Sequence, residues 1–278
     1  MIKDINIKKK LINNWFVFLQ NEICKQFQNL EKSKKKINNK KFKKRQWIKI
    51  NGGGGTSFFL KNGNVFDQVG VNQSTVHGTF KKEFRSKIPG AKKTGIYWAS
   101  GISVVAHMKN PKIPAIHFNT RFIVTTKEWF GGGMDVTPSF KDKTEEKKIH
   151  NKLRLICKQN KKNYKKYKKW CDKYFYLPHR NETRGIGGIF FDYKKKNWEK
   201  DFAFVRDVGI TFKNIFKTIV SKKCKKKWSV KQKELQYLKR GRYVEFNLIY
   251  DKGTKFGLQT GGNTEAILMS LPPLAKWK

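Results

Sequence analysis

Polar side chains recur at every second position of residues 115–125. His117, Asn119 and Arg121 alternate there with apolar residues such as Ile116. Because successive side chains of a β-strand point to opposite faces, these three share one face. Histidine transfers protons near neutral pH, and arginine binds carboxylates through two parallel hydrogen bonds. The pattern predicts a polar surface able to do such chemistry, and the alternative for the histidine is a purely structural role.

A second polar stretch lies shortly before this one in the chain. Ser103 and His107 fall on one face of the strand expected over residues 96–107. Pro111 and Pro114, which follow it, suit a connection between strands rather than a central strand. Two adjacent strands would therefore direct two histidines, a serine, an asparagine and an arginine at a common surface.

Two glycine-rich segments add candidates. Asp135 follows three consecutive glycines, which permit a close approach of backbone to a ligand, although the same aspartate suits a helix cap or a turn. Further on, Gly261, Gly262 and Asn263 precede a short helical pattern. The exposed N–H groups of such a helix entrance can hold a carboxylate, and the alternative is a plain capped helix.

Apolar residues at helical spacing predict helices over 11–31, 145–176 and 201–220. The lysine-rich residues 32–46 between the first helix and the first strand are expected to form a mobile loop. The chain shows no internal repeat and no second low-complexity linker. We therefore expect a single domain over residues 1–278.

Two further patterns indicate strands. Residues 242–251 alternate, with Tyr243, Glu245 and Asn247 on one face, and are expected to form a strand. The pair Asn62-Gly63 is typical of a tight hairpin turn between strands.

The composition restricts the class of protein. The 278 residues include 63 Lys plus Arg and 20 Asp plus Glu, a net charge of +43, and 14% are aromatic. The excess of lysine favours a solvated surface shaped by biased base composition. Nucleic-acid binding and steering of an acidic molecule are the alternatives. No apolar run is long enough to span a membrane, no secretory signal is visible, and the four cysteines form no C-x-x-C pair, so a cytoplasmic protein with reduced thiols is expected.

Five long segments carry a specific pattern: GVNQSTVHG (70–78), ASGISVVAHMKNPKIPAIHFNTRF (99–122), WFGGGMDVTP (129–138), YKKWCDKYFYLPHRNETRGIGGIFFD (167–192) and GRYVEFNLIYDKGTKFGLQTGGNTEAILMSLPPLAKW (241–277). In this order they resemble the oxygen-dependent coproporphyrinogen III oxidases. The resemblance implies an α+β fold, with a large antiparallel sheet flanked by helices on both faces. It also implies a homodimer.

The activity that the resemblance implies is the oxidative decarboxylation of two propionates of coproporphyrinogen III, on rings A and B. The products are protoporphyrinogen IX, CO2 and H2O2, within haem biosynthesis. O2 is the co-substrate and no organic cofactor is expected, because the electron-rich porphyrinogen itself reduces O2. No specific nucleic acid is expected as a partner. The sequence alone leaves two other possibilities open, an inactive porphyrinogen-binding relic and a basic nucleic-acid-binding protein.

The resemblance also assigns roles. It makes His117 the proton donor and Asp135 the acceptor of pyrrole N–H groups, and both are predicted catalytic residues. A divalent metal cation such as manganese is a further possibility, which the spacing of its ligands does not support. The predicted substrate-binding residues are Ser103, Asn119, Thr120, Arg121, Gly261, Gly262 and Asn263, and the candidate metal ligands are His107, His117, His150 and His179.

Two departures from the family pattern concern the C-terminal part. Asn263 stands where the family commonly has an arginine that would pair with a propionate. An asparagine supplies no charge, so weaker substrate binding is expected. The chain also ends soon after Trp277, from which we expect a shortened segment near the dimer contact.

Overall fold

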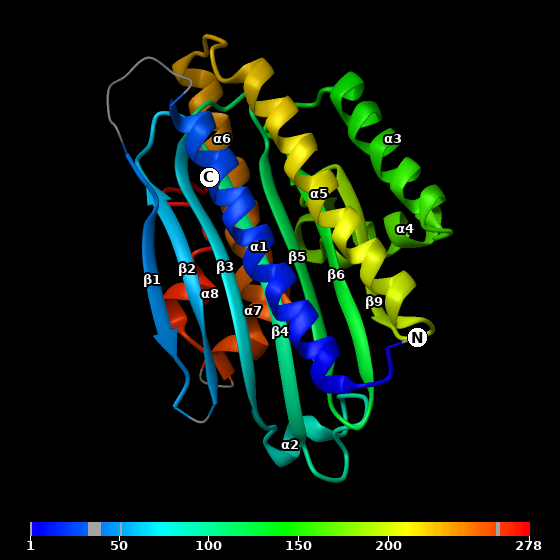
Figure 1. Cartoon of the computed structure of the whole chain (residues 1–278). Helices are drawn as coiled ribbons and strands as arrows, with labels where there is room; N and C mark the ends of the chain where they lie inside the picture. Colours follow the sequence, from blue (N-terminus) through cyan, green and yellow to red (C-terminus); the bar gives the residue numbers. More distant parts are fainter. Residues whose placement is uncertain (1, 33–39, 51, 260–261) are drawn as a thin grey trace.

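Seven antiparallel strands form one sheet in the order β1-β2-β3-β4-β5-β6-β9 (Figure 1). The computed structural model describes residues 2–32, 40–50, 52–259 and 262–278. Each strand from β2 to β6 pairs with the strand that precedes it in the chain, so short connections suffice. The strands are β1 (Lys43–Ile48), β2 (Gly53–Lys61), β3 (Phe66–Thr79), β4 (Ile96–Met108), β5 (Ala115–Val124), β6 (Glu128–Thr137) and β9 (Gly187–Lys194).

Helices cover both faces of this sheet (Figure 1). One face carries α1 (Ile5–Lys32) and α5 (Trp198–Lys223), which lie side by side, with α3 (Lys143–Gln159) beside α5. The other face carries α6 (Val230–Glu245), the π-helical turn η2 (Phe246–Tyr250), α7 (Lys252–Gln259) and α8 (Thr264–Leu268). The expected α+β fold is confirmed.

Short elements complete the chain. The helix α4 (Tyr164–Tyr174) packs against β9 at the edge of the sheet, where Tyr174 stacks on Phe190 at 4.5 Å between ring centroids. The remaining elements are α2 (Lys82–Arg85), β7 (Tyr176–Leu177), the 3-10 turn η1 (Pro178–Arg180) and β8 (Glu182–Thr183).

The main core lies between the sheet and the pair α1 and α5. The residues of β5 alternate between buried and half-buried positions, so that Phe118 and Phe122 point into this layer. Phe118 stacks on Phe212 of α5 with centroids 4.8 Å apart, and Phe27 of α1 contacts Phe216 of α5 at the same distance. Each buried aromatic removes about 150–250 Å² from water, so this layer supplies much of the stabilisation.

Most of the expected elements are found close to where the patterns place them. The helices expected over 11–31 and 201–220 are parts of α1 and α5, and the strands expected over 96–107 and 115–125 are β4 and β5. Asn62 takes the left-handed conformation, with φ 54°, in the turn between β2 and β3. These predictions are confirmed.

The strand expected over residues 242–251 is wrong, because these residues continue α6 and then form η2. A capping box of Ser229 and Gln232 starts this helix. Its buried stripe includes polar side chains, so an apolar helical period is missing from the sequence. Over a short window such as residues 242–251, the apolar and polar residues alternate, and this alternation is typical of a strand. The buried stripe consists of Gln236, Arg240, Tyr243 and Asn247, at helical spacing.

Two further expectations need correction. Residues 145–176 form two helices rather than one, because Asn163 caps a new helix start with its side chain on the Lys166 N–H. Of the loop expected over residues 32–46, Lys32 ends α1 and residues 43–46 belong to β1, which pairs with β2. Residues 33–39 lie outside the described residues.

Candidate active site

The strand register brings the predicted polar residues to one face. Ser103 of β4 lies opposite Asn119 of β5, and His117 lies opposite Asp135 of β6. Arg121 lies two residues beyond Asn119 on the same side. This face is turned away from α1 and α5 and lies beside α6 and η2, so the alternation of β5 separates an apolar layer from a polar one. The common surface predicted from the alternation is therefore present.

His117 lies between Asp135 and Asn119. Its Nδ1 is 2.7 Å from Asp135 Oδ1, and its Nε2 is 3.0 Å from Asn119 Nδ2. A carboxylate only accepts, so Nδ1 carries the proton and donates it, and Nε2 accepts from the amide. The side chain of His117 is 17% exposed and that of Asp135 only 2% exposed. The imidazole is thus the solvent-facing member of the pair, and the carboxylate holds it in one tautomer.

The second oxygen of Asp135 binds a buried arginine. Arg184 Nη2 donates to Asp135 Oδ2 at 2.6 Å, and Nη1 donates to Asn247 Oδ1 at 3.0 Å. The guanidinium is packed against the rings of Phe175, Tyr243 and Phe246, with its central carbon 4.1, 4.3 and 4.7 Å from their centroids. A guanidinium is weakly hydrated and stacks on aromatic faces, which suits it to this buried position.

Two opposing effects act on Asp135. Burial disfavours the carboxylate and would raise its pKa, but the charge of Arg184 and the hydrogen bonds from His117 and Arg184 outweigh burial and lower the pKa. The carboxylate therefore stays ionised beneath His117. Such a charge would stabilise an imidazolium if His117 gains a second proton.

Asn119 has one unused group. Its amide nitrogen is occupied by His117, whereas its Oδ1 is buried and has no hydrogen-bond partner among the described residues. Leaving a buried acceptor unpaired costs about 1–3 kcal/mol. An N–H donor of a bound molecule next to His117 would remove that cost.

Arg121 is held by an ion pair. Its Nη2 donates to Asp192 Oδ2 of β9 at 2.5 Å, while the arginine side chain stays 34% exposed. A Cβ atom at Gly131 would lie 2.3 Å from Asp192 Oδ1 and 2.9 Å from Arg121 Nη2. The glycine run before Asp135 therefore leaves room for this pair. The alternative of a helix cap for Asp135 is wrong, since the residue lies inside β6.

Thr120 does not join this face. It lies between Asn119 and Arg121 in an alternating strand, so its side chain points the other way and is 1% exposed. The assignment of Thr120 to substrate binding stays a prediction, and a ligand beside His117 would meet its backbone rather than its side chain.

The C-terminal segment lies over β3 and β4 on the polar face. Asn72 donates to the Ala266 carbonyl at 2.6 Å, and Gln68 donates to the Leu271 carbonyl at 2.7 Å. Asn263 caps α8 as predicted, accepting from the Ala266 N–H at 2.9 Å. Its side-chain oxygen is thereby engaged. Gly262 donates its N–H to the Gly257 carbonyl at 2.8 Å, and Gly261 lies outside the described residues.

The four histidines considered as metal ligands have separate surroundings. His107 Nε2 lies 2.9 Å from the Ser270 carbonyl, and burial lowers the pKa of His107 to about 3, with the charge of Arg240 adding to the effect. His150 contacts the Ile186 carbonyl and the Tyr164 hydroxyl. His179 contacts the Tyr250 hydroxyl and the Glu245 carboxylate, and His117 contacts Asp135 and Asn119 as described above.

These contacts do not fit a shared metal ion. Three ligands of a metal must converge on one point with their lone pairs free. Within residues 2–32, 40–50, 52–259 and 262–278, no group of three or more His, Cys, Asp or Glu side chains is arranged to hold one.

Arg184 and Asn247 are the members of this site that the sequence patterns do not single out. Arg184 precedes a glycine-rich strand and looks like a loop cation, and Asn247 falls in the segment expected to be a strand. The one signal available is position: Arg184 lies within a long segment that carries the family resemblance.

The comparisons with known proteins identify the family of this chain. The sequence matches the family described as "Coproporphyrinogen III oxidase" over residues 11–278. It is 51% identical over 274 residues to "Oxygen-dependent coproporphyrinogen-III oxidase" of Rickettsia akari (strain Hartford), covering 97% of this chain and 98% of the relative. The protein of the same name from Rickettsia bellii (strain OSU 85-389) is 50% identical with the same coverage.

The chain belongs to the coproporphyrinogen III oxidase family. The shortened segment near the dimer contact stays a prediction, and these relatives are aligned over 98% of their own length.

Proposed function

We propose that this chain is an oxygen-dependent coproporphyrinogen III oxidase of haem biosynthesis. Each turnover would convert a propionate side chain, –CH2CH2COOH, and O2 into a vinyl group, CO2 and H2O2. The substrate side chain loses two electrons and O2 gains them, so that atoms and charges balance without another oxidant. Rings A and B would react and yield protoporphyrinogen IX.

One observation of the structure carries this proposal, the chain of contacts Asn119–His117–Asp135–Arg184 on the polar face of the sheet. Both carboxylate oxygens of Asp135 are already bound, Oδ1 by His117 and Oδ2 by Arg184, and its side chain is 2% exposed. It therefore acts through His117, holding Nδ1–H and stabilising positive charge that develops nearby. His117 Nε2 is the atom at which a proton would be taken up or returned.

The same face offers groups for a macrocycle with carboxylates on its edge. Asn119 Oδ1, which has no hydrogen-bond partner within the described part of the chain, would accept a pyrrole N–H, and the exposed edge of Arg121 suits a propionate. Ser103, half-buried opposite Asn119, is a further predicted contact. The net charge of +43 favours the approach of a molecule with four carboxylates.

Turnover of coproporphyrinogen III, started without O2 and continued with O2, tests the proposal. We expect protoporphyrinogen IX to appear only after O2 is admitted, and chromatography separates the products. The experiment is carried out after exhaustive chelation, because the histidine contacts do not fit a metal. Tight binding without product, even after manganese is restored, would instead identify a porphyrinogen-binding relic.

The oligomeric state and location follow from other features. We infer a homodimer, supported by exposed apolar side chains on η2, α7 and the C-terminal segment. Sedimentation equilibrium would test it. A cytoplasmic location is supported by four buried cysteines that are all free thiols. Among the described helices, none has both the length and the hydropathy to cross a bilayer. The exposed apolar residues are Leu248, Ile249, Phe256, Leu258, Leu274 and Trp277.

A further inference from the structure

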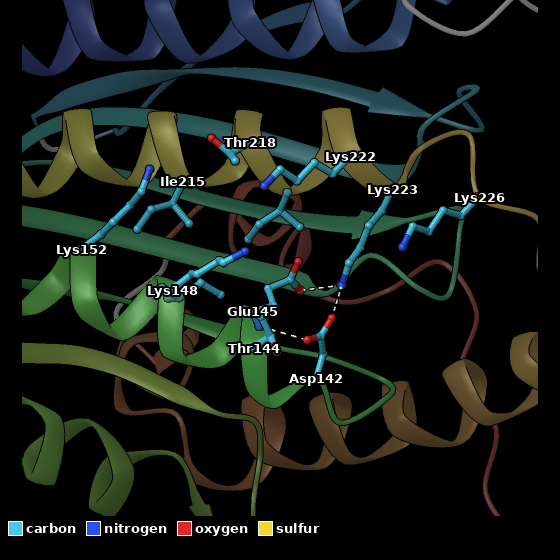
Figure 2. A pocket seen from close by; sticks show the side chains of 12 residues that line it. Asp142, Thr144, Glu145, Lys148, Lys152, Ile215, Thr218, Lys222, Lys223 and Lys226 are labelled. Carbon is cyan, nitrogen blue, oxygen red and sulfur yellow. Dashed lines mark hydrogen bonds and ion pairs between the residues drawn. The ribbon is translucent and has the colours of Figure 1, made fainter.

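A groove with an apolar floor and a basic rim lies between α3 and α5 (Figure 2). Its floor consists of Ile149, Ile215 and Ile219, which are buried between the two helices. The cavity measures about 180 Å³. A water molecule takes up about 30 Å³ of the liquid, so the cavity has room for a phosphate group and a few adjoining carbons. The rim carries four exposed lysines, Lys148, Lys152, Lys222 and Lys226.

A fifth lysine of the groove, Lys223, is paired with carboxylates, unlike the four lysines of the rim. Lys223 lies 2.7 Å from Glu145 and 3.1 Å from Asp142, so its charge is compensated and ties the end of α5 to the start of α3. None of the four rim lysines forms an ion pair with a described residue. Figure 2 shows Lys148 and Lys222 reaching into the space between the helices from opposite sides. The groove thus keeps a surplus of positive charge above an apolar floor.

The neighbouring helix adds an apolar stripe on the same side of the sheet. Ile7, Leu11 and Phe18 of α1 are 50%, 39% and 51% exposed. They follow each other at helical spacing and therefore share one outward face of α1. Lys10 and Lys25 lie on that outward face too and are exposed. A helix face with exposed apolar groups and flanking lysines suits the boundary between lipid headgroups and acyl chains.

We propose that the face formed by α1, α5 and α3 docks on a membrane surface rich in anionic phospholipid, with a headgroup phosphate in the α3–α5 groove. Lysine is a compact point charge that binds phosphate without demanding bidentate geometry. The exposed apolar side chains Ile7, Leu11 and Phe18 of α1 would enter the boundary with the acyl chains, whereas a free phosphate would leave them in water. This charge and apolar surface together favour a lipid over a free anion.

The docked orientation leaves the candidate active site open. His117 and Arg121 lie on the opposite face of the sheet from α1 and α5, so an aqueous substrate can still reach them. Membrane binding and turnover are therefore separable measurements, and the failure of one would not imply the failure of the other.

Co-sedimentation of the full chain with vesicles tests the proposal. The vesicles contain phosphatidylcholine alone or phosphatidylcholine mixed with phosphatidylglycerol, at physiological ionic strength. We expect binding to the mixed vesicles only. Replacing the four rim lysines by glutamine should lower the partition coefficient more than about 10-fold, since a lysine near an anionic bilayer contributes substantially to binding.

A matched variant separates the groove from total charge. Lys81, Lys82, Lys92 and Lys93 are also exposed and lie in or near α2 at one end of the sheet. Their replacement by glutamine removes the same charge and should change the partition coefficient less than about 3-fold. Both variants should keep turnover. Circular dichroism checks that each is folded.

A second pair of variants tests the apolar stripe. Phe18→Ser should weaken binding to mixed vesicles several-fold. Ile48→Ser, at an 88% exposed position on the edge strand β1, should not. Equal loss in the two lysine variants would overturn the proposal and leave net charge alone as the cause. Saturable binding of inorganic phosphate that needs the rim lysines, without vesicle binding, would overturn the lipid assignment.

Discussion

Strand β5 sends Phe118 into the layer beneath α1 and α5, and it sends His117 into the opposite layer beside η2. Phe118 meets Phe212 through a stacked ring contact, which many apolar side chains of similar volume would replace at moderate cost. His117 meets Asp135 and Asn119 through hydrogen bonds, which only particular donors and acceptors satisfy. One strand therefore carries two kinds of constraint.

The difference lies in how the partners depend on each other. On the apolar face, each ring contributes through the area that it removes from water, and the loss of one leaves the rest in place. On the polar face, Asp135 and Arg184 are both almost fully buried, with side chains 2% and 1% exposed. Removing one leaves an uncompensated charge in the other, which costs about 3–5 kcal/mol. A substitution of Asp135 or Arg184 is therefore expected to lower both the turnover and the free energy of unfolding.

The largest effect is expected from Asp135→Asn. The amide no longer fixes the Nδ1–H tautomer of His117 or stabilises positive charge, so turnover should fall by about 10³-fold. The loss of the partner of Arg184 should also lower the free energy of unfolding. Product formation and denaturant unfolding measure the two effects.

A double variant separates these two losses. Asp135→Asn combined with Arg184→Gln removes both buried charges and should recover part of the stability but none of the turnover. If turnover returned with stability, Asp135 would be a structural residue only.

The next effect concerns the apolar face. Phe212→Ala removes the ring that stacks on Phe118 and should lower the free energy of unfolding by about 3–5 kcal/mol. Turnover per folded molecule should stay near that of the parent chain, because no group of the polar face is touched. Urea unfolding and activity at low temperature measure these quantities. A large loss of kcat in the folded fraction would show that the two faces are coupled.

A smaller effect is expected at the edge of the site. Arg121→Gln removes a charge proposed to bind a propionate and should raise KM by about 10- to 100-fold while kcat changes less. Gly131→Ala should act in the same direction, because its Cβ would displace the pair of Arg121 and Asp192. Ser221→Ala, at an exposed position on α5, serves as a control that should leave KM unchanged. A fall in kcat alone would contradict binding through Arg121.

The sequence alone predicted much of the fold, because an apolar period reports directly on burial. This period predicted the helices α1 and α5, and the alternation in β5 predicted which of its side chains face the apolar layer. It failed over residues 242–251, where the buried stripe is polar. It also failed for Arg184, whose burial depends on the nearby ring of Phe175 and on the rings of Tyr243 and Phe246 from a distant segment. No local pattern records such a contact, because the partners are brought together only by the folded chain.

The pH dependence of stability tests the difference between the polar and the apolar face of the sheet through the smallest expected effect. His107 is 1% exposed on the polar face, and burial lowers its pKa to about 3 from an ordinary value of 6.5. Below pH 6.5 His107 becomes protonated in the unfolded chain, whereas in the folded chain it stays neutral down to about pH 3. Stability is therefore full above pH 6.5 and is lost as the pH falls toward 3.

Between pH 7 and pH 5 this one residue should cost about 2 kcal/mol, at about 1.4 kcal/mol per unit of pH. His107→Gln should be less stable at pH 7 but should lose correspondingly less stability on acidification. His77→Gln, at an exposed position of β3, should keep the parent slope. Phe212→Ala should also keep the parent slope, since the phenylalanine side chain carries no titratable group. An unchanged slope in His107→Gln would mean that the acid response arises elsewhere on the polar face, with Glu245 the first residue to examine, because the hydrogen bond from Arg180 lowers its pKa to about 2.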